Sequence, residues 1–332
     1  MNKSRLTVSG APHTHSNESV RKIMWAVVLA LLPALGVSVF YFGLPALLIT
    51  VVSVCSCLLF EYLIQSFLLK RPTSILDGSA VITGMLLAFN LPANISLWIV
   101  ILGALVAIGI GKMAFGGLGK NLFNPALVAR VFLLISFPKQ MTTWPVAQPI
   151  WHFRFSDAVT GPTPLALVKE GVKNGQSMDT LMHNTQMPDY LQMAVGQMGG
   201  SFGEVSAIAL LIGAVFLLLR KVISWHIPVS FLLTAFLFSG IFWLANPAQF
   251  ATPWFHLLSG GLMLGACFMA TDMVTSPMST RGMLVFGCGC GLLTIIIRLF
   301  GSYPEGVSFS ILIMNALVPL INKLFKPKRF AK

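Results

Sequence analysis

The chain alternates between long apolar runs and short polar connections. Each apolar run covers roughly 16–22 residues, which is the length a helix needs to cross about 30 Å of hydrocarbon. The pattern therefore predicts an all-α integral membrane protein with about ten transmembrane helices. The predicted spans are residues 23–42, 44–66, 75–91, 95–113, 121–137, 203–219, 225–244, 256–272, 283–300 and 306–322.

One long polar segment separates these runs into two groups of five. We expect a first five-helix repeat at 23–137 and a second at 203–322, with a tail at 1–22 and a basic tail at 323–332. The polar segment, residues 138–202, is rich in Gly, Pro, Gln, Asn and Thr. It is too long for a simple connector, and loops of this length are often functional.

An internal repeat relates the two groups. Residues 77–90 match residues 259–272 without a gap, and five spans separate equivalent positions. An odd number of spans inverts the second copy across the membrane, and inverted repeats place shared sites near the midplane, commonly at broken helices. The matches are short, so chance similarity between apolar helices is the alternative. Two weaker echoes follow downstream: Lys112–Gly116 with Arg298–Gly301, and Ala126–Val128 with Ala316–Val318.

Composition supports the membrane class. The 332 residues are 56% hydrophobic and 10% charged, whereas soluble domains carry about 25% charged residues. The net charge of +12 could indicate nucleic acid, but no aromatic side chains interleave with the basic residues, so no nucleic-acid partner is expected. We expect a multi-pass protein of the cell inner membrane in contact with membrane lipid.

The basic residues also predict an orientation. Sixteen of the 22 Lys and Arg fall on one side of the ten-helix topology, and cytoplasmic loops carry such an excess. Both termini are therefore expected in the cytoplasm, and segment 138–202 on the periplasmic or extracellular side. The sixteen are Lys3, Arg5, Arg21, Lys22, Lys70, Arg71, Lys112, Lys120, Arg220, Lys221, Arg281, Lys323, Lys326, Lys328, Arg329 and Lys332.

Ionisable residues that lie within or at the ends of predicted spans include Glu61, Asp77, Arg130, Asp272 and Arg298. A charge in lipid costs several kcal/mol unless it faces a partner or a cavity, so each is a functional candidate. Asp77, Arg130 and Asp272 are candidates for an intramembrane ion path. Asp77 and Asp272 have the alternative of lying at helix ends in the headgroup layer. Arg130 is deeper, where it could pair with a carboxylate or hold the polar edge of a cofactor.

Other motifs are weak. The glycine-rich stretch 116–120 fails the Walker spacing, because Ala114 stands where the first glycine is needed.

The chain has two Cys-x-Cys pairs, Cys55 with Cys57 and Cys288 with Cys290. In each pair the two residues point to different helix faces, so neither pair readily chelates one ion and no metal site is predicted. Small packing residues are the favoured interpretation, with a cluster shared between two subunits as the alternative. No Ser-His-Asp or paired-carboxylate arrangement indicates hydrolysis.

The most informative polar motif runs from Asp157 through Thr160, Gly161 and Thr163 in the long segment. On composition alone, Thr-Gly-Pro-Thr-Pro is a turn. Proline disfavours the helical region for the residue before it, so Gly161 and Thr163 are expected to be extended, with the Thr163 hydroxyl displayed outward.

Several blocks of the chain resemble the RnfD/NqrB family. RnfD belongs to the Rnf electron-transport complex, and its paralogue NqrB belongs to the sodium-pumping NADH:quinone reductase. The resemblance covers roughly residues 20–325. Its most specific blocks are Lys112–Arg130, Leu258–Asp272 and Tyr303–Gly306.

The resemblance implies FMN bound by a phosphoester to a threonine in a pattern like Asp-x-x-Ser/Thr-Gly-Ala-Thr. Asp157, Thr160 and Gly161 match this pattern, and Thr163 falls on the acceptor position. Pro162 stands where the pattern has Ala, and Met273 stands where relatives commonly have Pro.

The resemblance further implies a urea-channel-like fold of two inverted five-helix repeats and, by analogy with the paralogue, a non-covalent riboflavin. The implied partners are Rnf subunits A, B, C, E and G. We therefore expect one component of an ion-translocating oxidoreductase, without complete activity alone, that relays electrons in ferredoxin:NAD oxidoreduction coupled to sodium or proton movement. The competing hypotheses are a passive channel or transporter for a small neutral solute, and a scaffold protein of the complex without a cofactor.

Overall fold

The computed structural model describes residues 19–147, 160–185 and 187–326. Within these residues the protein is mostly helical, and its strands form one ribbon of two-residue strands, so the all-α prediction is confirmed for them. The bundle helices are α1 (Val20–Phe42), α2 (Leu44–Leu63), α3 (Ser79–Phe89), α4 (Leu97–Leu105), α5 (Pro125–Ser136), α10 (Ala207–Leu219), α11 (His226–Ala245), α12 (Pro253–Leu258), α13 (Leu262–Leu264), α14 (Thr280–Phe300) and α15 (Val307–Leu324). Short π-helical and 3-10 segments extend or join them: η1 (Ile64–Leu68), η2 (Ile75–Asp77), η3 (Val106–Ile110), η4 (Met113–Phe115) and η6 (Gly265–Met269).

Six helical segments in the described residues are long and apolar enough to cross a membrane. The multi-pass prediction is thus supported, whereas the count of ten spans is not confirmed. Three predicted spans contain only the shorter helices α3, α5 and α10. An eleven-residue helix such as α3 rises only about 16 Å, about half of the hydrocarbon thickness. The six segments are Val20–Phe42, Leu44–Leu68, Leu97–Phe115, His226–Ala245, Thr280–Phe300 and Val307–Leu324.

A fourth predicted span, 256–272, is broken near its start. Helix α12 ends at Leu258, and α13 with η6 resumes at Leu262. Gly260 between them has φ +64°, a left-handed conformation that L side chains rarely adopt. The internal repeat aligns Gly260 with Gly78, which precedes α3 and has φ +85°. The two matched stretches therefore share a local break, while their inversion across a membrane stays a prediction.

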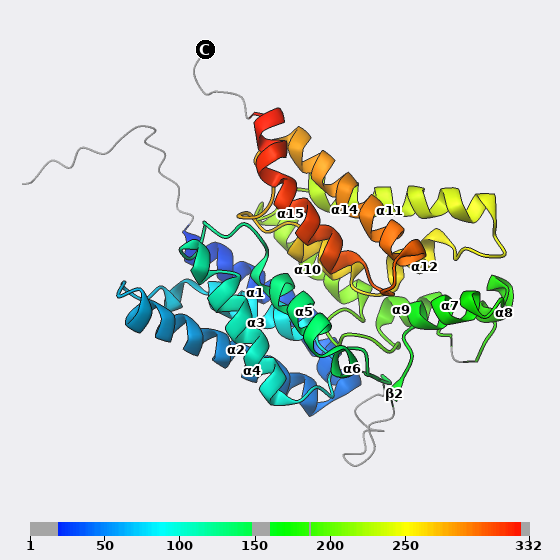
Figure 1. Ribbon diagram of the computed structural model, residues 1–332, viewed down its shortest axis with the longest axis horizontal. Helices are drawn as coiled ribbons and strands as arrows, with labels where there is room; N and C mark the ends of the chain where they lie inside the picture. Colours follow the sequence, from blue (N-terminus) through cyan, green and yellow to red (C-terminus); the bar gives the residue numbers. More distant parts are fainter. Residues whose placement is uncertain (1–18, 148–159, 186, 327–332) are drawn as a thin grey trace, which may run out of the picture.

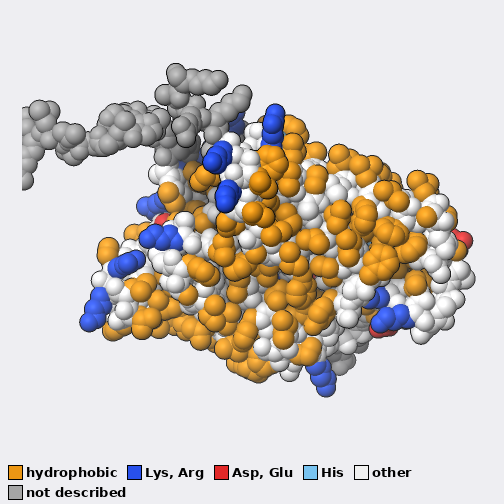
Figure 2. Space-filling view, turned by 45° about the horizontal axis from the view of Figure 1, so that its top comes forward, with side chains coloured by type: hydrophobic (Ala, Val, Ile, Leu, Met, Phe, Trp, Pro, Cys, Tyr) orange, Lys and Arg blue, Asp and Glu red, His pale blue; other side chains and the backbone are white. Residues whose placement is uncertain are grey.

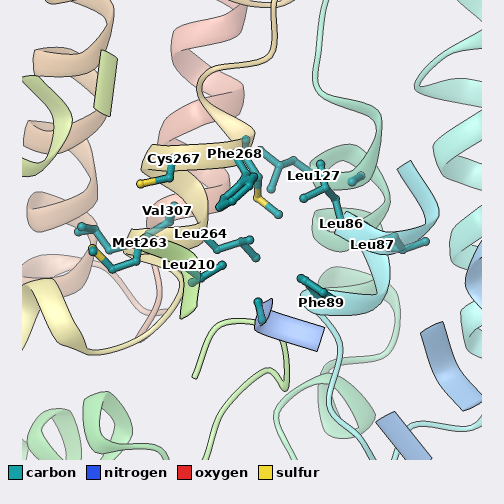
Figure 3. Packing of buried hydrophobic residues seen from close by; sticks show 14 of the residues in the cluster. Leu86, Leu87, Phe89, Leu127, Leu210, Met263, Leu264, Cys267, Phe268 and Val307 are labelled. Carbon is teal, nitrogen blue, oxygen red and sulfur yellow. The ribbon is translucent and has the colours of Figure 1, made fainter. Parts of the chain in front are cut away.

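The two groups of helices pack against each other through a shared apolar core (Figure 3). Leu86 and Phe89 of α3 and Leu127 of α5 lie beside Leu264 and Phe268 of the second group. Lipid tails are as apolar as these side chains, so close packing, rather than removal of apolar surface from water, favours association within a bilayer. The exterior fits the same environment, because one face is broadly apolar and few charged side chains interrupt it (Figure 2).

The described residues of the polar segment, 138–147, 160–185 and 187–202, form short elements away from the C-terminal end of α15 (Figure 1). They are α6 (Pro138–Met141), β1 (Trp144–Pro145), β2 (Thr160–Gly161), α7 (Pro164–Lys173), α8 (Met178–Met182) and α9 (Tyr190–Val195). Strands β1 and β2 are antiparallel, with Trp144 opposite Gly161 and Pro145 opposite Thr160. This ribbon leads the chain directly into α7.

Candidate functional site

Thr163 is the N-cap of α7. Its backbone is extended, with φ −73° and ψ 156°, and Pro164 follows as the first helical residue, where proline is well tolerated. The Thr163 Oγ1 accepts a hydrogen bond from the Ala166 N–H at 3.2 Å. The predicted extended backbone is thus confirmed.

The outward display of the Thr163 hydroxyl is wrong. The Thr163 side chain is only 7% exposed, and it faces pockets between α7 and neighbouring segments. Among the described residues of the motif, Thr160 and Pro162 are exposed, and Thr160 lies in the strand β2 that pairs with β1. Asp157, the fourth member of the motif, lies outside the described residues.

Arg130 projects from α5 into a buried polar cluster near Thr163. It forms ion pairs with Glu204, at 3.0 Å, and with Glu305. Its Nη1 also donates to Asn90 Oδ1 at 2.6 Å and to Ser308 Oγ at 2.9 Å. Pairing with a carboxylate was one of the two roles that the sequence left open for Arg130, and the structure shows it with two partners.

Thr163 and Arg130 line the same pocket, which has a volume of about 310 Å³. Its aromatic wall consists of Trp144, Tyr303 and Phe309, and the rings of the last two stack with centroids 5.3 Å apart. A volume of this size lies at the lower end of the range of ligand pockets, about 300–1,000 Å³. The site thus combines a hydroxyl, a buried cation and stacked aromatic rings, which can hold a planar, polar-edged group.

A second buried ion pair lies near the start of α3. Lys112 Nζ donates to Glu61 Oε2 at 2.7 Å and to Ser79 Oγ at 2.6 Å, and both charged side chains are almost fully buried. Gln65 and Ser74 also donate to Glu61 Oε1, at 3.1 and 3.0 Å. Lys112 is one of the sixteen basic residues expected on the cytoplasmic side. Its charge is buried in an internal ion pair and does not lie on the surface.

Asp77 and Asp272 serve local backbone structure. Asp77 Oδ1 accepts from the Ser79 N–H at 2.7 Å and from the Ser79 hydroxyl at 2.6 Å. Asp272 accepts from the Thr275 hydroxyl at 3.1 Å and from the Val274 N–H at 3.4 Å. Both residues therefore make local contacts at helix ends, while a position in the headgroup layer and a role in an ion path both stay predictions.

The candidate path residues do not meet at one site. Asp77 precedes α3 and Asn90, the partner of Arg130, follows it, so about 16 Å of helix lies between them. Asp272 lines a different pocket, of about 100 Å³, together with Lys112. Their joint role in ion movement stays a prediction.

Arg298 is buried at the break between α12 and α13. Its Nη1 donates to the His256 carbonyl at 2.6 Å and its Nη2 to the Ser259 carbonyl at 2.9 Å. Among the described residues it forms no ion pair within 4 Å. It therefore satisfies two carbonyls at the break in the helix. One guanidinium can do this because it carries five N–H donors.

Residues 7–331 match the NQR2, RnfD, RnfE family. The chain belongs to this family. Among its curated relatives is the D subunit of the Na⁺-translocating ferredoxin:NAD⁺ oxidoreductase complex of Acetobacterium woodii, 45% identical over 99% of this chain and 96% of the relative. The D subunit of the proton-translocating ferredoxin:NAD⁺ oxidoreductase complex of Clostridium ljungdahlii is 42% identical over 99% and 97%. The D subunit of the ion-translocating oxidoreductase complex of Stutzerimonas stutzeri is 40% identical over 95% and 93%.

The sequence pattern of this family member did not single out Glu204 and Glu305 as the acidic partners of Arg130. Glu204 and Glu305 stand at the borders of predicted spans, directly before α10 and α15, and their position beside apolar runs was the available signal. Asn90 was likewise visible, because the repeat aligns it with Asp272. What no sequence signal supplied was their convergence on one guanidinium.

Proposed function

We propose that this chain is the D subunit of an Rnf-type ion-translocating ferredoxin:NAD⁺ oxidoreductase, and that it carries FMN on Thr163. Two relatives that cover nearly the whole chain are named as D subunits of ion-translocating ferredoxin:NAD⁺ oxidoreductase complexes, and a third is named as the D subunit of an ion-translocating oxidoreductase complex; these names support the first part. The observation that carries the second part is the placement of the Thr163 hydroxyl on the pocket that Arg130 and the aromatic wall also line.

The helix that follows Thr163 supports a phosphoester at this residue. A phosphate on Oγ1 would lie at the N-terminus of the ten-residue helix α7, where the helix dipole stabilises an anion by about 0.3–1 kcal/mol. Glu204 and Glu305 also line the small pocket beside Thr163, and both are paired with Arg130. This pairing limits the repulsion that their carboxylates would exert on a phosphate.

The larger pocket supports the ring system. FMN, when bound, supplies a carrier that takes up and releases electrons one at a time, and the protein sets its position and potential. Tyr303 and Phe309 offer stacking surfaces, and Arg130 lines the pocket as a guanidinium already paired with Glu204 and Glu305. The tether at Thr163 would keep the ring from diffusing away. The non-covalent riboflavin that the resemblance implies stays a prediction.

The proposed complex contains Rnf subunits A, B, C, E and G as partners in the inner membrane, with both termini of this chain in the cytoplasm and segment 138–202 on the opposite side. The complex couples electron transfer to movement of sodium or protons. The names of the relatives from Acetobacterium woodii and Clostridium ljungdahlii specify different ions, at 45% and 42% identity. Overall similarity therefore does not select the ion for this chain.

In-gel flavin fluorescence under denaturing conditions tests the attachment. The full chain, purified from membranes that contain its complex, should fluoresce, and Thr163→Val should abolish the signal. Thr180→Val is the matched control, because it removes an exposed hydroxyl of the same polar segment outside the motif and should keep the signal. Wild-type fluorescence in Thr163→Val would refute attachment at this residue.

The same gel separates the competing functions. A scaffold protein predicts no fluorescence in the wild-type chain. A passive channel also predicts no bound flavin, together with flux of a small neutral solute through the isolated chain in vesicles. Covalent fluorescence without such flux supports the electron-carrier function.

A further inference from the structure

Helix α7 separates two pockets whose charged linings differ. Thr163, Ala166 and Glu170 contribute to the pocket that contains Arg130. Lys169 and Lys173, one turn apart, contribute to a second pocket of about 190 Å³. The second pocket lies between α7 and the segments around α12 and the end of α14, and it is distinct from the flavin site proposed above.

The second pocket is lined by cations without carboxylates. Its charged lining consists of Lys169, Lys173 and Arg298, and no acidic side chain is among its described lining residues. Among the described residues, Lys169 Nζ donates to the backbone carbonyls of Gly301, at 2.5 Å, and Tyr303, at 2.8 Å. Lys169 is partly exposed and Lys173 is exposed, whereas Arg298 is buried and forms no direct ion pair among the described residues. Buried charges in proteins are usually paired, so the charge of Arg298 is the one that this arrangement leaves to be balanced.

Two buried side chains of the pocket have unused polar atoms. Arg298 and His256 are only 5% and 4% exposed, and both line the pocket. Arg298 Nε and His256 Nδ1 have no hydrogen-bond partner among the described residues. Glu204 and Glu305 balance part of the charge of Arg298 from a distance, but their direct ion pairs are with Arg130.

The lysines repel each other in the absence of an anion. Burial, followed by repulsion from Lys173, lowers the pKa of Lys169 from its ordinary value of 10.5. An anion between the two ammonium groups would stabilise the charged form of both. The cationic lining of the pocket and the lowered pKa of Lys169 thus both favour an anionic ligand.

We propose that the pocket between α7, α12 and α14 binds a phosphate group, supplied by a membrane phospholipid or by free phosphate. The guanidinium and ammonium groups suit phosphate oxygens, and arginine in particular matches the geometry of phosphate. The volume of about 190 Å³ is below that of a typical pocket for a whole drug-sized ligand and suits a headgroup. Val172, Phe250 and Phe300 form an apolar wall, and Phe300 is 65% exposed, which would receive the start of an acyl chain.

Binding to the purified full chain in detergent tests this site. One arm titrates dioleoylphosphatidylglycerol and counts bound lipid by native mass spectrometry. The other arm titrates inorganic phosphate against chloride at equal ionic strength and follows the melting temperature. We expect Lys169→Gln/Lys173→Gln to weaken binding at least tenfold in the responding arm. Lys169→Arg/Lys173→Arg should restore it, which separates charge from folding.

Lys139→Gln is the matched control, because Lys139 is an exposed lysine of the same polar segment outside this pocket. It should bind like the wild type. A response in the lipid arm alone assigns the site to a phospholipid, and a response in the phosphate arm alone assigns it to free phosphate. Equal binding by the double Gln variant and Lys139→Gln would overturn the proposal. A carboxylate from a neighbouring protein paired with Arg298 in a structure of the assembled complex would overturn it as well.

Discussion

Replacing Arg130 with methionine should strongly destabilise the protein. The substitution keeps a long apolar stem but removes the cation that faces Glu204 and Glu305. Breaking a buried ion pair by removing one partner costs about 3–5 kcal/mol, because the remaining charge stays buried. Arg130 also donates to Asn90 and Ser308, so we expect a loss in the upper part of this range.

The loss can be measured as a fall in the melting temperature of the full chain in detergent. A thiol-reactive dye reports unfolding, because Cys57, Cys267 and Cys290 are buried in the folded protein. In domains of 150–250 residues, 1 kcal/mol corresponds to about 2–4 °C. At the lower end of that scale, Arg130→Met should lower the melting temperature by at least about 6 °C.

Two further variants test the cause. Glu204→Gln added to Arg130→Met should restore part of the stability, because it removes one uncompensated carboxylate. Arg130→Lys should lie between the wild type and Arg130→Met, because it keeps the charge but cannot reach all four partners. A melting temperature of Arg130→Met within about 2 °C of the wild type, or a further fall on adding Glu204→Gln, would refute the ion-pair explanation.

Three other variants or conditions test single contacts. Lys112→Met should lower the free energy of unfolding by about 3–5 kcal/mol, because it leaves the carboxylate of Glu61 buried without its cation. Lys112→Met/Glu61→Gln should recover most of this loss. A melting series in which the double variant is the least stable would contradict the explanation. Gly260→Ala should destabilise by about 1–3 kcal/mol, because its φ is +64° and the added Cβ would lie 2.8 Å from Leu165 Cδ1; unchanged chemical denaturation would contradict it. Phosphate binding beside α7 should weaken as pH rises, beginning below pH 10.5, because the lowered pKa makes Lys169 lose its proton earlier than a free lysine; a pH titration of binding that stays flat up to pH 10.5 contradicts this.

The long helices could be predicted from the sequence, because a chain in lipid must satisfy its backbone polar groups internally and an apolar helix does so. The breaks could not be predicted to the residue. The end of α12 depends on the backbone angle of Gly260 and on the carbonyls that Arg298 binds, and both result from tertiary packing. The start of α5 depends similarly on Asn124, whose side chain caps the helix and also donates to the Met269 carbonyl in the other group.

The candidate site, like the fold, could be predicted only in part from the sequence. The sequence singled out Arg130 as a deep cation and Thr163 as the acceptor of a motif. It could not select Glu204 and Glu305, which are 74 and 175 residues away from Arg130 along the chain. It also placed the Thr163 hydroxyl outward, because the local effect of proline fixes the backbone angles but not which way the β1–β2 ribbon turns the side chain.

Mass spectrometry of one tryptic peptide tests the central claim most directly. Cleavage after Arg154 and Lys169 releases residues 155–169, which contain both Thr160 and Thr163. The proposed function predicts that this peptide, from chain purified out of its native membrane, carries the mass of FMN less one water, and that fragmentation places it on Thr163. An unmodified peptide, or a modification placed on Thr160, would contradict the account.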